Sequence, residues 1–68
     1  MGKKEDSISV FKFTTELHPD VHWVWEILGN IYVAVGDKNQ GIKCLEKALE
    51  LNPHDLYVRN SLNELTRK

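Results

Sequence analysis

The chain has 68 residues, 41% of them hydrophobic and 28% charged, and its formal net charge is −1. This length allows one small domain at most, or a piece of a longer array, and the composition is ordinary for a soluble globular protein. The near-neutral charge gives no electrostatic reason to expect a nucleic acid or an anionic membrane as the partner.

A first helix is predicted near the N-terminus, after a polar segment. Residues 1–6 are polar and are expected to be disordered. From residue 7 to residue 18 the apolar residues recur with helical rather than alternating spacing; they are Ile8, Val10, Phe11, Phe13 and Leu17. Pro19 ends this helix, because proline disfavours helical geometry in the residue before it. Asp20 is then expected to cap the next helix.

The second predicted helix, Val21–Val35, is the most apolar segment of the chain. Gly36 is expected to end it, since glycine adopts the left-handed conformation that often follows a helix. Asp37 is expected to begin the third helix. Gln40, three residues later, completes a capping-box pattern.

The third predicted helix covers residues 38–51 and is closed by Pro53, as the first is closed by a proline. A fourth helix is expected at about residues 55–66. No segment alternates convincingly as a strand would. The sequence therefore predicts an all-α fold of about four helices, packed as antiparallel hairpins.

A period of 34 residues underlies these elements. Pro19 and Pro53 are 34 positions apart, and residues 11–28 align with residues 45–62 without a gap. Such a period is typical of stacked repeats, whose units cannot bury their apolar faces alone. It favours an α-solenoid that offers a surface to partners over a protein with a catalytic pocket.

Residues 22–55 resemble a tetratricopeptide repeat. The residues that carry the resemblance, at the spacings of that family, are Trp25, Leu28, Gly29, Tyr32, Gly36, Asp37, Ala48 and Pro53. Two positions depart from the family, because Gly41 stands where alanine is usual and Leu45 where an aromatic residue is common. Gly29 and Gly41 are expected to be small enough to let the second and third helices approach closely. Glycine in place of alanine at position 41 is nevertheless expected to cost that helix about 0.5–1 kcal/mol.

The resemblance also divides the domain, residues 7–68, into parts. Residues 7–18 correspond to the second helix of a partial repeat, residues 22–55 to a complete repeat, and residues 55–66 to a terminal capping helix. The whole chain is also similar to the short repeat tail at the C-terminus of some bacterial serine hydrolases. That similarity implies a non-catalytic accessory domain.

In the tetratricopeptide family the first helix of each repeat lines the concave face of the array. The resemblance implies that the partner-binding residues here are Trp23, Glu26, Ile27, Asn30, Val33 and Ala34. Because only Glu26 and Asn30 are polar, we expect an apolar groove that is covered by a peptide, an adjoining domain or a second copy of the chain. Trp23 is the candidate anchor, since aromatic residues dominate binding hot spots, and packing against Phe13 is its alternative role.

Two further expectations concern the choice of partner. Some family members grip the C-terminal carboxylate of heat-shock chaperones with a clamp of basic residues and asparagines. Asn30 matches one clamp position, but Glu26 stands where a lysine is needed, which argues against that activity. A homodimer is the alternative, formed by exchange of the Ser7–Leu17 helix with Phe11 and Phe13 in the contact.

The sequence gives no sign of an enzyme or of a cofactor. No catalytic constellation or phosphate-binding loop can be assembled. His18 and His22 are separated by Pro19, and His54 lies in the equivalent turn, so the histidines are interpreted as ordinary turn residues and no metal site is expected.

The single cysteine excludes internal disulfides. No apolar run reaches the roughly 18 residues of a membrane span. No export signal is recognisable, so the expected location is the cytoplasm unless a signal lies upstream of a fragment.

Overall fold

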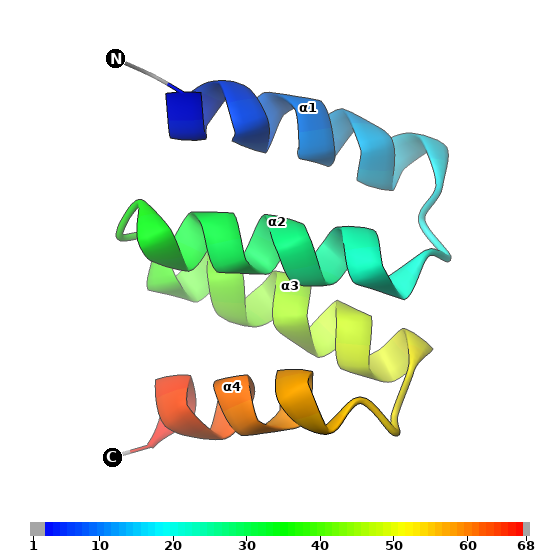
Figure 1. The fold of residues 1–68 in the computed structure, drawn as a ribbon, viewed down its shortest axis with the longest axis vertical. Coiled ribbons are helices and arrows are strands. Elements are labelled where there is room, and N and C mark those ends of the chain that lie inside the picture. Colours follow the sequence, from blue (N-terminus) through cyan, green and yellow to red (C-terminus); the bar gives the residue numbers. More distant parts are fainter. Residues whose placement is uncertain (1–2, 68) are drawn as a thin grey trace.

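The computed structural model describes residues 3–67. Within them lie four α-helices: α1 (Lys3–Leu17), α2 (His22–Ala34), α3 (Lys38–Leu51) and α4 (Leu56–Thr66). The helices follow one another antiparallel, with α1 and α4 at opposite edges of the array (Figure 1). The array measures 31 × 27 × 14 Å along its principal axes, so it has two broad faces. The predicted all-α fold of helical hairpins is confirmed.

Helix α1 begins earlier than the sequence predicts. It starts at Lys3, so residues 3–6 are helical and the expected disordered segment is wrong for them. Met1 and Gly2, the rest of that segment, lie outside the described residues. Lysine and glutamate are good helix formers. Once the apolar part of α1 has formed a helix, each added residue extends it at little cost.

The entry into α2 also differs from the prediction. The residue at the N-cap is Val21, with φ −96° and ψ 105°, and no side chain caps the helix, so the expected cap by Asp20 is wrong. A turn precedes the helix, in which the Val21 N–H donates to the His18 carbonyl at 3.3 Å. This turn leaves Asp20 one residue ahead of the cap position. In the same turn, the Pro19 carbonyl accepts a hydrogen bond of 2.9 Å from Trp25 Nε1.

The predicted turn at Gly36 and the predicted cap of α3 are confirmed, and α4 has a similar cap. Gly36 has a φ of 94° and reverses the chain after α2. The Asp37 carboxylate accepts a hydrogen bond from the Gln40 backbone N–H at 3.2 Å and so caps α3. Asp55 caps α4 in the same way, since its Oδ1 accepts from the Val58 N–H at 3.2 Å.

Helices α2 and α3 approach each other through two buried glycines. A methyl group on Gly29 would lie 2.9 Å from Leu45 Cγ, and one on Gly41 would overlap Val33 Cγ2 and lie 2.9 Å from the Gly29 carbonyl oxygen. The sequence predicts that Gly41 is small enough for this close approach, which is confirmed, and that glycine costs the helix some stability relative to alanine. In the structure the helices are too close for alanine, so the glycine is required by packing.

The main hydrophobic cluster lies between α3 and α4. It consists of the buried residues Leu45, Ala48, Val58 and Leu62, against which Trp25, Ile42, Leu49 and Leu65 pack. Val24 and Leu28 of α2 are also buried. Helix α2 packs against both α1 and α3, and α4 packs against α3. In the part of the chain that is described, no helix is long and apolar enough to cross a membrane.

Candidate functional site

The six residues predicted to bind a partner all lie on α2, and none is fully buried. We call them the α2 face: Trp23, Glu26, Ile27, Asn30, Val33 and Ala34. Trp23 and Ala34 are exposed, and the other four are half-buried. Val33 lies directly over Gly41, so its side chain also serves the packing of α2 on α3.

Two tryptophans at the start of α2 have different environments. Trp25 is half-buried, packs against the cluster between α3 and α4, and donates its Nε1–H to the Pro19 carbonyl. Trp23 is 53% exposed, and Phe13, its alternative packing partner, is 60% exposed. Trp25 is therefore part of the folded core, whereas Trp23 leaves half of its surface available.

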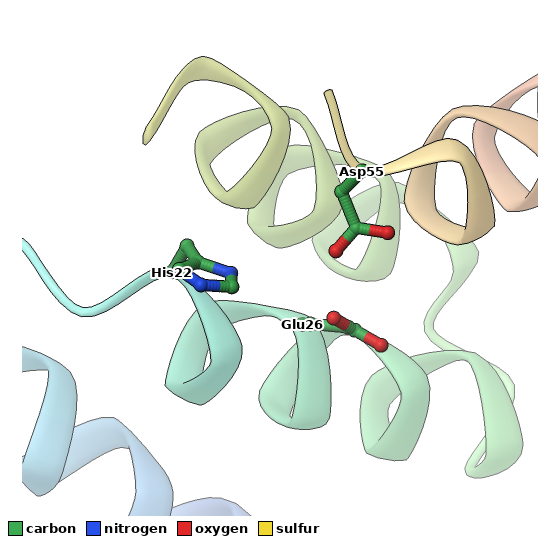
Figure 2. Close-up of side chains that lie close together, drawn as sticks. All are labelled: His22, Glu26 and Asp55. Atoms are coloured by element: carbon green, nitrogen blue, oxygen red, sulfur yellow. The ribbon is translucent and has the colours of Figure 1, made fainter. Parts of the chain in front are cut away.

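Next to Trp23, three titratable side chains converge. Figure 2 shows the His22 imidazole and the carboxyl groups of Glu26 and Asp55 close together, between α2 and the start of α4. One ring nitrogen of His22 and one oxygen of each carboxyl group all lie within 4.8 Å of one another. His22 and Glu26 are one helical turn apart on α2, whereas Asp55 is the residue that caps α4. All three residues are half-buried.

Burial and the neighbouring side chains of the cluster shift the pKa of Glu26. Partial burial raises the pKa of Glu26 above its ordinary value, and the nearby Asp55 raises it further through its charge and a hydrogen bond between the two side chains. His22 acts in the opposite direction and lowers the pKa of Glu26. Yet Nδ1 of His22 is buried and has no hydrogen-bond partner. The cluster thus holds two carboxyl groups close together beside an imidazole ring, one nitrogen of which, Nδ1, makes no hydrogen bond.

The comparison with protein families agrees with this architecture. The family model of the tetratricopeptide repeat matches residues 22–55, which is half of the chain. The chain belongs to the tetratricopeptide repeat family. The repeats of this family generally mediate protein–protein interactions, and the repeat is not itself catalytic. No curated protein matches the chain, so the similarity to a hydrolase tail stays a prediction.

The matched repeat runs from His22, the first residue of α2, to Asp55, the cap of α4. The cluster therefore joins the two ends of one tetratricopeptide repeat. The sequence analysis did not predict this cluster, because it considered only the three histidines as metal ligands. The available signal was a histidine and a glutamate one turn apart in α2, with an aspartate at the entry to the next repeat. His18 and His54 are exposed and lie outside the cluster.

A cleft of about 220 Å³ lies elsewhere on the molecule, between α1 and the two helices of the repeat. Its lining includes Thr15, Trp25, Leu28, Tyr32 and Cys44, and no residue of the α2 face. Burial raises the pKa of the Cys44 thiol, which disfavours the reactive thiolate. Four of its lining residues, Trp25, Leu28, Tyr32 and Cys44, are buried or half-buried residues of the repeat.

Helix α1 carries an exposed apolar strip outside the matched repeat. Val10, Phe13 and Leu17 are each about 60% exposed, and their spacing places them on one side of the helix. Phe11, which was predicted together with Phe13 to mediate self-association, is half-buried instead. Phe13 is thus the aromatic residue of α1 that is more available to a second molecule.

Proposed function

We propose that this tetratricopeptide repeat binds a peptide segment of a partner protein along the α2 face, with Trp23 as the anchor. The exposure of Trp23 is the observation that carries the proposal. Its neighbour Trp25 is packed and hydrogen-bonded, so the fold does not need Trp23 in the same way. Large exposed aromatic side chains are unfavourable in water and are common anchors at interfaces.

A second exposed aromatic residue supports the proposed peptide-binding surface. Tyr57 stands 34 positions after Trp23, at the equivalent place of the next repeat unit, and it is 61% exposed. The two aromatic side chains therefore occupy matching positions on α2 and α4. A peptide that lies across both helices would meet one aromatic side chain on each.

The expected contribution of Trp23 to the binding free energy follows from its exposed area. A tryptophan side chain buries up to about 250 Å², and roughly half of that is still exposed at Trp23. At about 25 cal/mol per Å², covering it contributes about 3 kcal/mol. Truncation of Trp23 should therefore weaken binding by roughly 100-fold.

The test begins with peptides selected from a random displayed library on the wild-type chain. Their affinities are then measured by fluorescence anisotropy for the wild type, Trp23→Ala and Phe13→Ala. Phe13→Ala is the matched control, because it removes an equally exposed aromatic residue from α1. We expect a loss of about 100-fold for Trp23→Ala and less than twofold for the control. Equal binding by the folded Trp23→Ala variant and the wild type would contradict the proposal.

Self-association through α1 is the second candidate function, and the exposed strip of Val10, Phe13 and Leu17 favours it. Two copies that cover each other's strips would bury this apolar surface. Sedimentation velocity over a dilution series should then show a dimer that dissociates on dilution and that Phe13→Asp abolishes. A monomer at every concentration would exclude this function.

A further inference from the structure

The cluster of His22, Glu26 and Asp55 has two unmet requirements. Two carboxyl groups are held close enough to interact, and their like charges repel each other when both groups are ionised. In addition, Nδ1 of His22 is buried without a hydrogen-bond partner, although buried polar atoms in proteins are nearly always partnered. A cation bound between the three side chains would offset the repulsion between the carboxylates and take one imidazole nitrogen as a ligand.

We propose that His22, Glu26 and Asp55 bind a divalent transition-metal ion, for which Zn²⁺ is the best match. Imidazole nitrogen and carboxylate oxygen are both common ligands of zinc. Magnesium and calcium prefer oxygen ligands alone, so the histidine favours zinc over them. The proposal does not rest on peptide binding by the α2 face, although Glu26 belongs to both the cluster and that face.

The backbone fixes the directions from which the three ligands come. His22 and Glu26 are separated by one turn of α2, so their side chains share one side of the helix. Asp55 is held in place by the hydrogen bond from the Val58 N–H to its Oδ1, and this bond occupies only one of its two oxygens. The third ligand is thereby positioned by the start of α4, opposite the two ligands on α2 (Figure 2).

The spacing of the ligand atoms is close to that of a zinc site. In a tetrahedral site with bonds of about 2.0–2.1 Å, the ligand atoms are about 3.4 Å apart. Those of the cluster lie within 4.8 Å of one another, so side-chain rotations that move each atom by about 1 Å would close the site. All three residues are half-buried. An ion can therefore enter from solvent, and a water molecule can complete the coordination.

Metal binding would have a structural consequence. Two ligands stand at the start of the complete repeat and the third at the start of the following helix. The ion would therefore tie α2 to α4. Both helices pack against α3. A ligand that binds only the folded chain also stabilises it, in proportion to the logarithm of its concentration.

Isothermal titration calorimetry with ZnCl₂ tests the proposal on the full chain, purified without a histidine tag, at pH 7.5. We expect one Zn²⁺ per chain and far weaker binding of MgCl₂. His22→Gln and Glu26→Gln should each weaken zinc binding by about 100-fold or more, since even loss of a supporting hydrogen bond weakens metal sites by 10- to 100-fold. Asp55→Asn should weaken it too, while asparagine still caps α4.

The matched controls are His54→Gln and Glu46→Gln, which change the same residue types at exposed positions outside the cluster. Both should bind zinc like the wild type. Circular dichroism establishes that each variant is folded, and Glu26→Gln, which keeps the shape of the side chain, provides a test that does not depend on the histidine variant. Absence of zinc binding by the wild type, or unchanged binding by the folded cluster variants, would overturn the assignment.

Discussion

Replacement of Gly41 by alanine tests the close approach of α2 and α3. Alanine favours the helical state over glycine by about 0.5–1 kcal/mol, so propensity alone predicts a more stable protein. In the structure the new methyl group would overlap Val33 Cγ2 and lie 2.9 Å from the Gly29 carbonyl oxygen. The Val33 side chain can change rotamer, but a backbone carbonyl cannot move without its helix.

Overpacking of this kind costs about 1–3 kcal/mol. The upper part of that range applies, because one of the two clashes is with backbone. After the gain in propensity is subtracted, Gly41→Ala should lower the free energy of unfolding by about 1–2 kcal/mol. Urea titrations followed by far-ultraviolet circular dichroism measure this difference directly.

Two companion variants separate the causes. Asn60→Ala changes an exposed position of α4 and should stabilise the chain by about 0.5 kcal/mol, because only propensity changes there. Val33→Ala removes one of the two clashing groups, so in the double variant Gly41→Ala should cost about 1 kcal/mol less than it does alone. A Gly41→Ala variant as stable as the wild type would refute the packing described for α2 and α3.

Three other predictions concern stability. Trp25→Ala should cost about 3 kcal/mol, because it empties space beside the core, whereas Trp23→Ala should change stability by less than about 0.5 kcal/mol; urea titrations of the two variants compare them. Asp55→Ala should cost about 1 kcal/mol through loss of the α4 cap, and Asp55→Asn much less, as thermal unfolding would show. The pKa of Glu26 is raised from 4.5 in the folded chain by burial and Asp55, against the opposing effect of His22. The folded state therefore holds that proton more tightly, and stability relative to Glu26→Gln should fall as pH rises from about 4.5 through the folded pKa. Equal pH profiles of the two proteins would contradict this.

The features that the sequence predicted correctly are set by local rules. Proline, glycine and aspartate act on the residues beside them, so the ends of α3, the turn at Gly36 and the cap at Asp37 follow from a few neighbouring residues. The 34-residue period then supplied the long-range information, since it implies that similar units stack. The family model matches residues 22–55.

Most features that the sequence did not predict depend on distances between helices, and the start of α2 is a local exception. The start of α2 shifted by one residue because the preceding turn, and not Asp20, determines where the helix begins. The sequence predicts that Gly29 and Gly41 allow α2 and α3 to approach closely, but the exclusion of alanine at Gly41 follows only from the distance between the helices. The cluster of His22, Glu26 and Asp55 joins two helices whose separation depends on how the repeat closes.

The central claim is that a partner peptide binds the α2 face with Trp23 as its anchor. The two indole N–H signals in a ¹H–¹⁵N spectrum test it most directly. Trp23 is half exposed, whereas the Trp25 indole N–H is hydrogen-bonded to the Pro19 carbonyl. During titration with a selected peptide, we predict large shifts of the Trp23 indole signal and of the Glu26 and Asn30 amides, with little change at the Trp25 indole. Shifts confined to α1, with an unchanged Trp23 signal, would contradict the claim.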